Sequence, residues 1–222
     1  STASHEPVGL APDPATTPEP VVQVYAARTW GARGAFAVHT WIAVKPASAA
    51  TWTVYEVIGW KMRWSGSALS VSERAPDARW YGNSPELLAE RRGEGVAALI
   101  ERIDHAARAY PYARDYTTWP GPNSNTFTAW ISRAVPELKL DLPPTAIGKD
   151  YLGDRMIASA PSGSGVQFSL GGFFALTASG VEGLEVSLLG LTFGIDPFSP
   201  ALKLPLLGRL GPTRQTVLPE RI

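Results

Sequence analysis

The sequence predicts an α+β fold, in which an antiparallel sheet packs on helices and a β-rich extension follows at the C-terminal end. Three observations lead to this prediction. Between Val21 and Trp60, three apolar stretches are separated by short Gly- or Pro-bearing connectors, as in neighbouring antiparallel strands. Helical spacing of apolar residues follows, and the region after Pro136 is apolar but too rich in Gly for helix. With 222 residues, 45% of them hydrophobic, the chain is long enough for a real core.

The chain divides into three predicted parts. Residues 1–20 hold five prolines and little aliphatic bulk, so we expect an extended tether. Residues 21–150 form the core. Residues 151–222 form the β-rich extension, which we expect to pack on the core because so apolar a tail is too small to cover its own strands.

Composition excludes several kinds of function. Twenty basic and twenty acidic residues give a net charge of zero, so we expect no nucleic-acid partner. The chain has no cysteine and only three histidines, and we therefore expect no metal site and no cofactor. It begins with Ser and has no charge-free apolar stretch of about twenty residues, so the sequence as given predicts neither a signal peptide nor a membrane span. A mature or truncated part of an exported protein would fit these observations as well.

The periodicity of apolar residues assigns the elements of the core. Strands are predicted at Val21–Ala27, Ala35–Val44, Thr51–Trp60 and Ala68–Arg74. Helices are predicted at Pro85–Arg92, with Ser84 as its cap, at Val96–Tyr110, and at Ser124–Val135.

The segment Gly121–Phe127 (GPNSNTF) is the strongest candidate for a functional site. Asn123 is a preferred N-cap, which places Ser124 in the first helical turn. Free N–H groups and the positive end of the helix dipole stabilise negative charge there, as an acyl-transfer nucleophile requires. The Ser124 N–H, with Asn123 or Asn125, would bind the oxyanion. The simpler alternative is that these residues only cap the helix.

His39 is the best candidate for a catalytic base. His5 belongs to the tether, and His105 lies off the apolar stripe of its helix. In its strand, His39 shares a face with small residues and Trp41, whereas the other face is continuously bulky and predicts core. The small neighbours leave room for a ligand beside the imidazole.

Glu56 on the next strand is the candidate partner of His39. If the connector Lys45–Ala50 closes a symmetric hairpin, Val44 pairs with Thr51 and His39 lies directly opposite Glu56. A carboxylate there would fix the ring tautomer and stabilise the imidazolium. A one-residue slip would move Glu56 to the other face, and a surface pair without function remains the alternative.

The C-terminal extension is predicted to be β-structure. Between Val166 and Pro197 we expect two or three strands with turns at Gly171–Gly172 and Ser179–Gly183, and then an extended segment at Pro200–Pro212. These strands would close the core, form a groove for an acyl chain, or rest on a membrane. One apolar face is expected to be buried against residues 21–135; it consists of Phe168, Leu170, Phe173 and Phe174.

A strand bearing His39, a strand bearing Glu56 and a helix opened by Ser124 follow one another in the chain. This order resembles the circularly permuted papain-like superfamily. Asn123–Phe127 (NSNTF) is similar to the Asn-Cys-Glu-His-Phe of its lecithin:retinol acyltransferase-like branch, with Ser124 in place of the cysteine. Glu56, in VYEV, matches the triad carboxylate of NlpC-type relatives. The resemblance implies a permuted papain-like core with Ser124, His39 and Glu56 as its catalytic residues.

The chain also resembles a family of proteobacterial envelope proteins known only as a domain of unknown function. The segments AVHTWIAVK, GPNSNTF and ALKLP…GRLG carry this resemblance, which covers nearly all of Val21–Gly211. It implies a location in the cell envelope, at the periplasmic face of the inner membrane, and an N-terminal membrane segment that precedes this chain. It brings no known activity.

Two functions follow as hypotheses. One is a hydrolase or acyltransferase that acts on an amide or ester of an envelope peptide, lipid or acyl group. The other is a membrane-tethered binding or scaffold module with a vestigial site, because an alcohol replaces the thiol of the superfamily and ionises only in concert with a base. A cleft filled by Trp41, Tyr116 or Trp119 would favour the module, and an open groove would favour the enzyme. The sequence does not predict the oligomeric state.

Overall fold

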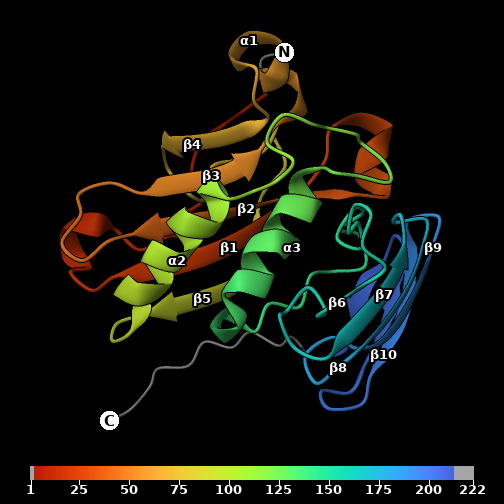
Figure 1. Ribbon diagram of the computed structural model, residues 1–222. Helices are drawn as coiled ribbons and strands as arrows, with labels where there is room; N and C mark the ends of the chain where they lie inside the picture. Colours follow the sequence, from red (N-terminus) through yellow and green to blue (C-terminus); the bar gives the residue numbers. More distant parts are fainter. Residues whose placement is uncertain (1–2, 213–222) are drawn as a thin grey trace.

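Two antiparallel sheets and three α-helices make up residues 3–212, the part of the chain described in this computed structural model (Figure 1). The predicted α+β class is therefore confirmed. The first sheet has the order β4-β3-β2-β1-β5, with β1 at Val21–Arg28, β2 at Val38–Lys45, β3 at Thr53–Val57, β4 at Leu69–Glu73 and β5 at Glu86–Arg92. The helices are α1 at Met62–Ser65, α2 at Val96–Arg108 and α3 at Ser124–Ala134, and short 3-10 turns include η2 at Gly31–Ala35 and η3 at Gly59–Lys61.

The second sheet is a meander of seven strands in the order β12-β11-β10-β9-β8-β7-β6. Its strands are β6 at Ile157–Ala158, β7 at Val166–Leu170, β8 at Phe174–Ser179, β9 at Gly183–Leu188, β10 at Leu191–Asp196, β11 at Ala201–Leu204 and β12 at Gly208–Leu210. The turns after β7 and β8 lie where the sequence predicts them. The stretch predicted to hold two or three strands holds four, and the predicted extended segment forms the hairpin β11–β12.

Four predicted strands and two predicted helices of the core are confirmed, but the predicted helix at Pro85–Arg92 is wrong. This segment is strand β5, which pairs with β1 from Val21↔Arg92 to Ala26↔Glu86. Ser84 and Pro85 look like a helix start, and the residues that follow have good helix propensity. The free edge of β1 offers a ladder of backbone hydrogen bonds instead, with one register shift between Val24 and Tyr25, and tertiary pairing overrides local propensity.

Helices α2 and α3 cover one face of the first sheet (Figure 1). The core lies between these two layers. The sheet contributes the side chains at alternate strand positions, and the helices contribute the apolar side chains that recur at helical spacing. Its fully or almost fully buried side chains include Val22, Val24, Ile42 and Val44 from the sheet and Ile103, Phe127 and Ile131 from the helices.

The opposite face of the first sheet is covered by the N-terminal segment and the loop that follows β4. Tyr25 and Trp41 are buried there, and Ala11 and Trp80 pack against them. The segment predicted as an extended tether contains the 3-10 turn η1 at Pro14–Thr16 and is docked, because Leu10 and Ala11 donate their N–H groups to Asp77 Oδ2 at 2.6 and 3.2 Å. Residues 1–2 of that segment lie outside the described part of the chain.

The apolar face of the second sheet points away from the core, contrary to the sequence-based expectation. Leu170 and Phe173 are 45% and 46% exposed, whereas the alternating positions Gln167 and Ser169 are fully buried. Period-two alternation predicts that these sets lie on opposite faces, but not which face meets the core. Residues 213–222 of the predicted extension lie outside the described range.

Ion pairs hold the second sheet on the core. Lys149 Nζ donates to Glu185 Oε2 at 2.6 Å and to Asp150 Oδ1 at 3.1 Å. Lys203 Nζ donates to Asp141 Oδ1 at 2.7 Å and to Glu185 Oε1 at 2.8 Å. Burial alone would raise the pKa of Glu185, but the two ammonium groups outweigh burial and hold that pKa below its usual value. Glu185 thus serves as the shared anion between a cation of the core and a cation of the sheet.

Candidate functional site

The start of helix α3 leaves one backbone donor free. Asn123 Oδ1 accepts from the N–H groups of Asn125 and Thr126 at 2.9 and 3.2 Å, and Thr126 Oγ1 accepts from the Asn123 N–H at 3.0 Å. These bonds form a complete capping box. Among the described residues, neither the N–H nor the hydroxyl of Ser124 has a hydrogen-bond partner. Ser124 therefore presents an unused donor and an unused hydroxyl at the positive end of the helix.

The side-chain amides of the two flanking asparagines are already used. Asn123 Nδ2 and Asn125 Nδ2 donate to the carbonyl of Ile147 at 3.0 and 2.8 Å. Asn125 Nδ2 also donates to the carbonyl of Val38 at 3.0 Å. These amides tie the helix start to β2 and to the loop before the second sheet, which leaves the Ser124 N–H as the available oxyanion donor.

Strand β2 divides its side chains between two faces at this point. Thr40 Oγ1 lies 2.9 Å from Asn125 Oδ1 and 2.8 Å from Thr128 Oγ1, so Thr40 faces helix α3. By alternation, His39 belongs to the other face, where Trp41 is buried. His39 is only the second residue of β2, so its ring lies at the end of the sheet.

His39 and Glu56 form a buried hydrogen-bonded pair, as predicted. His39 Nε2 lies 3.0 Å from Glu56 Oε2, and Glu56 Oε1 accepts from Arg74 Nη2 at 3.2 Å. Burial alone would raise the pKa of Glu56, but hydrogen bonds and charges from His39 and Arg74 outweigh it and hold that pKa below its usual value. Glu56 occupies Nε2. The other ring nitrogen, Nδ1, has no hydrogen-bond partner among the described residues.

The predicted strand register is wrong by two residues. Val44 pairs with Thr53 rather than with Thr51, so His39 and Glu56 are diagonal neighbours and not directly opposite. An even shift keeps both side chains on one face, whereas an odd shift would have separated them. The diagonal distance is within reach of a long carboxylate side chain.

Two residues that the sequence did not single out complete the surroundings of the imidazole. The ring of Trp80 stacks on His39 with centroids 3.8 Å apart and planes 16° apart, and Trp41 lies on the ring at 5.6 Å. Arg74 contacts both Glu56 and the face of Trp41. Arg74 directly follows strand β4 and Trp80 lies in the loop after it, where no periodicity indicates a partner. The only available signal was the density of aromatic residues at 80–81.

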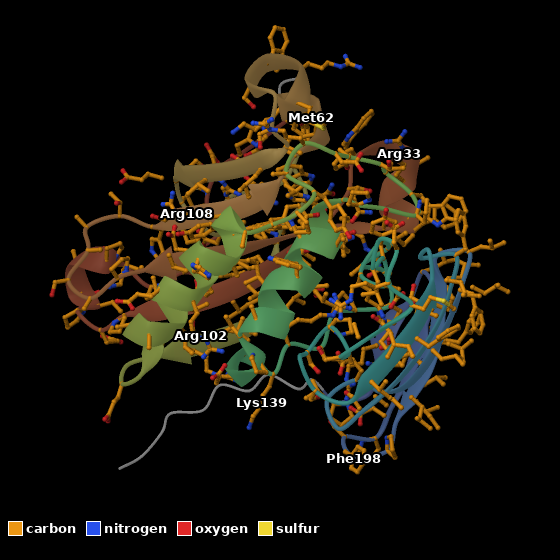
Figure 2. All side chains as sticks on the ribbon, viewed as in Figure 1. Arg33, Met62, Arg102, Arg108, Lys139 and Phe198 are labelled. Atoms are coloured by element: carbon orange, nitrogen blue, oxygen red, sulfur yellow. The ribbon has the colours of Figure 1, made fainter. Side chains whose placement is uncertain are left out.

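An open cleft of about 690 Å³ connects the imidazole and the helix start. Tyr116 and Trp119 line it, as predicted, together with Trp60 and Trp80. Trp41, also predicted to line the site, is instead fully buried beneath it. Burial raises the pKa of Tyr116, so this phenol remains a neutral hydrogen-bonding group in the cleft wall at ordinary pH. Arg33, which is labelled in Figure 2, also lines this cleft.

Ser124 and His39 both line this cleft, which makes them its nucleophile and base candidates. No hydrogen bond joins the two side chains within residues 3–212. Catalytic hydrogen bonds are often long in a ligand-free site and shorten when substrate binds. With a free hydroxyl, a free imidazole nitrogen and a free N–H around one cavity, the site has the chemical groups that acyl transfer needs.

No group of three or more His, Asp or Glu side chains in residues 3–212 is arranged to hold a metal ion. None of the helices described is both long enough and apolar enough to cross a bilayer.

Comparison with known proteins places the core within a family. Residues 19–151 match the family model described as "Protein of unknown function (DUF3750)". This range contains all of the first sheet, α2, α3 and the cleft, and it ends before the second sheet begins. No curated protein and no solved structure matches the chain.

Proposed function

The chain belongs to the DUF3750 family, whose function is unknown, and from that premise we propose that the cleft is the active site of a hydrolase or acyltransferase for an amide or ester. The His39–Glu56 pair carries this proposal. Glu56 holds one imidazole nitrogen at 3.0 Å in a buried environment and leaves the other unoccupied, and Ser124, at a helix start, lines the same cleft as His39. A buried carboxylate that fixes the tautomer of a histidine is a means of making that histidine a base.

In the proposed reaction, Ser124 Oγ attacks the carbonyl carbon of the substrate while His39 Nδ1 takes the hydroxyl proton. The Ser124 N–H donates to the oxyanion that forms. Collapse of the tetrahedral intermediate expels an amine or alcohol, which leaves with the proton from His39. Water, or an acceptor amine or alcohol, then attacks the acyl-serine, and His39 passes the proton of the attacking group back to Ser124.

The finer assignments belong to the same proposal. The order of His39, Glu56 and Ser124 along the chain supports a permuted papain-like enzyme in which an alcohol has replaced the thiol. The resemblance to envelope proteins supports a substrate in the cell envelope, such as a peptide, lipid or acyl group, and a location on the periplasmic face of the inner membrane.

A binding module with a vestigial site is the second candidate. The observation in its favour is the position of His39, which alternation directs away from helix α3 and which Trp80 covers at 3.8 Å. The open cleft favours the enzyme, since neither Tyr116 nor Trp119 fills it. Rearrangement of Trp80 on substrate binding would be required only for the enzyme.

Covalent labelling with a fluorophosphonate separates the two functions. The enzyme is expected to label on one serine, and Ser124→Ala is expected to abolish the labelling. Ser132→Ala is the matched control, because Ser132 lies two turns further along the same helix, is 1% exposed and has a hydroxyl without a hydrogen-bond partner in residues 3–212. Glu56→Gln and His39→Ala should slow the labelling without removing the reactive serine.

Labelling that survives in the Ser124→Ala variant would refute the assignment of the nucleophile. A wild-type protein that remains folded and does not react with the fluorophosphonate, or with an ester substrate, would favour the binding module. A crystal structure of the labelled protein would then measure the Ser124 Oγ to His39 Nδ1 distance directly.

A further inference from the structure

The second sheet has its polarity reversed with respect to a water-soluble sheet. Strand pairing places one set of sixteen side chains on its outward face, and all sixteen are apolar. Twelve of them are between 41% and 64% exposed: Ile157, Val166, Leu170, Leu176, Leu184, Val186, Leu188, Leu191, Phe193, Ile195, Leu202 and Leu210. The other four are Phe168, Phe174, Ala178 and Leu204. In Figure 2 the sticks on this side of the sheet are almost entirely carbon.

The inward face carries the polar residues. Gln167, Ser169 and Thr177 lie there with Glu185 and Lys203, and all five are buried against the core. Gln167 Nε2 donates to Thr177 Oγ1 at 3.0 Å. The carboxylate of Glu185 accepts from both Lys203 and Lys149, as described above. The inward polar set is thus satisfied within the protein. A sheet that met water on its outward face would be expected to show the opposite arrangement.

The exposed apolar surface is too large for an ordinary monomer. At about half exposure each, the twelve side chains present on the order of 1,000 Å² of apolar surface, against roughly 300–600 Å² for the largest patch of a typical monomer. The turns at both ends of the sheet extend it, because Phe173, Leu189, Phe198 and Leu207 are 46%, 60%, 70% and 64% exposed. This outward face, with its apolar turns, therefore needs a cover.

We propose that the outward face of the second sheet lies on the hydrocarbon of a lipid leaflet. Its composition points to lipid: none of the sixteen outward side chains has a hydrogen-bonding group or a charge. Protein interfaces form about one hydrogen bond per 100–200 Å² and are enclosed by a polar rim. Here turns at the ends of the sheet carry exposed apolar side chains as well, at Phe173, Leu189 and Phe198. Hydrocarbon is the partner that offers no polar group and requires none.

The shape of the face also favours lipid over a second copy of the chain. The face is hollowed by a groove of about 620 Å³ between the side chains of Phe168, Leu176, Val186 and Phe193. A two-fold dimer about the centre of this face would place two such hollows against each other and leave a void, which close packing disfavours. Fluid acyl chains fill a groove of any shape.

The candidate active site opens at the margin of this lipid-facing surface. The ring of Trp119, which lines the cleft, meets the ring of Phe173 edge to face with centroids 5.1 Å apart. Gly190, in the turn between β9 and β10, approaches Trp119 so closely that a Cβ there would lie 2.9 Å from Nε1. Tryptophan prefers the boundary between lipid and water. Resting on the proposed function, this continuity assigns a substrate with an acyl chain, which reaches the cleft from the leaflet.

Site-directed spin labelling tests the lipid contact directly. Because the chain has no cysteine, a single introduced cysteine carries the only nitroxide. Val186→Cys places it on the outward face, and Val71→Cys is the matched control, a valine of similar exposure (51% against 46%) on strand β4 of the first sheet. With phosphatidylcholine vesicles, the label at position 186 should become accessible to oxygen and lose access to a water-soluble nickel chelate. The label at position 71 should keep its access to the chelate.

Vesicle flotation provides the second measurement. The wild-type chain should float with phosphatidylcholine vesicles equally at low and high salt, because the face is uncharged. Val186→Glu should reduce the bound fraction about tenfold or more, since a carboxylate on this face would have to enter hydrocarbon, whereas Val71→Glu should leave it unchanged. Binding is read without turnover, so the result does not depend on whether Ser124 is catalytic.

Three results would overturn the proposal. The first is that adding vesicles does not change the accessibility of the spin label at position 186 to the nickel chelate. Another is flotation that Val71→Glu and Val186→Glu reduce equally. The third is a dimer in solution, measured by light scattering, that Val186→Glu dissociates and that shows no vesicle binding; the occupant of the face would then be a second copy.

Discussion

His39 and Glu56 meet at 3.0 Å although they are diagonal rather than opposite neighbours on β2 and β3. The pair depends on both residues lying on the same face of the sheet, and any even change of register preserves this condition. The imidazole is then held from three sides, by Glu56 at Nε2 and by the rings of Trp80 and Trp41. A ring held in this way has one nitrogen left for chemistry, and the activity should depend on the group that holds it.

Glu56→Gln is expected to lower kcat/KM for an ester substrate about 100-fold or more, because the amide no longer stabilises the imidazolium. Glu73→Gln, an exposed glutamate on the neighbouring strand β4, is the control and should leave the rate unchanged. Steady-state kinetics of the two purified variants measures the difference. Equal rates for both variants would mean that Glu56 does not orient the base.

The depressed pKa of Glu56 predicts a pH dependence of stability. Its folded-state pKa lies below the ordinary value of 4.5, so the carboxylate contributes stability that is fully present above about pH 4.5 and is lost as the pH falls through the folded pKa. Urea unfolding of the wild-type protein and Glu56→Gln should give a stability difference that shrinks on acidification below that pH. A difference that grew with acidification would contradict the sign of the shift.

Gly148→Ala is expected to destabilise the helix start by about 2 kcal/mol or more, through a clash added to backbone strain. The residue has φ +100, and a Cβ there would lie 2.2 Å from Asn123 Nδ2. The matched control is Gly93→Ala, at φ +87 with nothing within 4 Å, which should cost only the strain of about 1 kcal/mol. Denaturant midpoints measure both. Similar losses of stability in the two variants would show that the Asn123 side chain moves away from the added methyl group without an energetic cost.

Glu185→Gln should destabilise the protein by about 3–5 kcal/mol, because it leaves the buried Lys149 and Lys203 without their shared anion. The control Glu137→Gln removes a solvent-exposed ion pair with Arg102 and should cost about 1 kcal/mol or less. Thermal or urea unfolding measures both variants. A loss no larger for Glu185 than for Glu137 would mean that the buried cations find other partners.

Local sequence pattern predicted the first sheet and the two long helices well. The apolar stripe of α2, the cap at Asn123 and the alternation of β2 are local signals, and the structure follows them. Strand β5 was not predicted, because this segment is a strand only through its pairing with the free edge of β1, and no local sequence pattern indicates that pairing. The His39–Glu56 pair was predicted from an incorrect strand register. The error was two residues, an even number, so both side chains were still assigned to the correct face of the sheet.

The polarity of the second sheet and the contacts of Arg74 and Trp80 could not be predicted for a different reason. Alternation assigns residues to two faces of a strand, but the surroundings of each face are set by segments far away in the chain. In most sheets the apolar face meets the core, and here that assumption fails, because Lys149 and Asp141 offer charged partners to the polar face instead. A loop side chain such as that of Trp80 has no periodicity to indicate its contacts.

The ion pairs between the sheets also have an evolutionary consequence. Lys149 and Asp141 lie inside the residues that match the family, whereas Glu185 and Lys203 lie in the second sheet, beyond the matched range. A homologue that lost the second sheet would expose Lys149 and Asp141 to water and release both from selection. The residues at these two positions should therefore vary freely in any homologue that lacks the second sheet and remain charged in any homologue that has it.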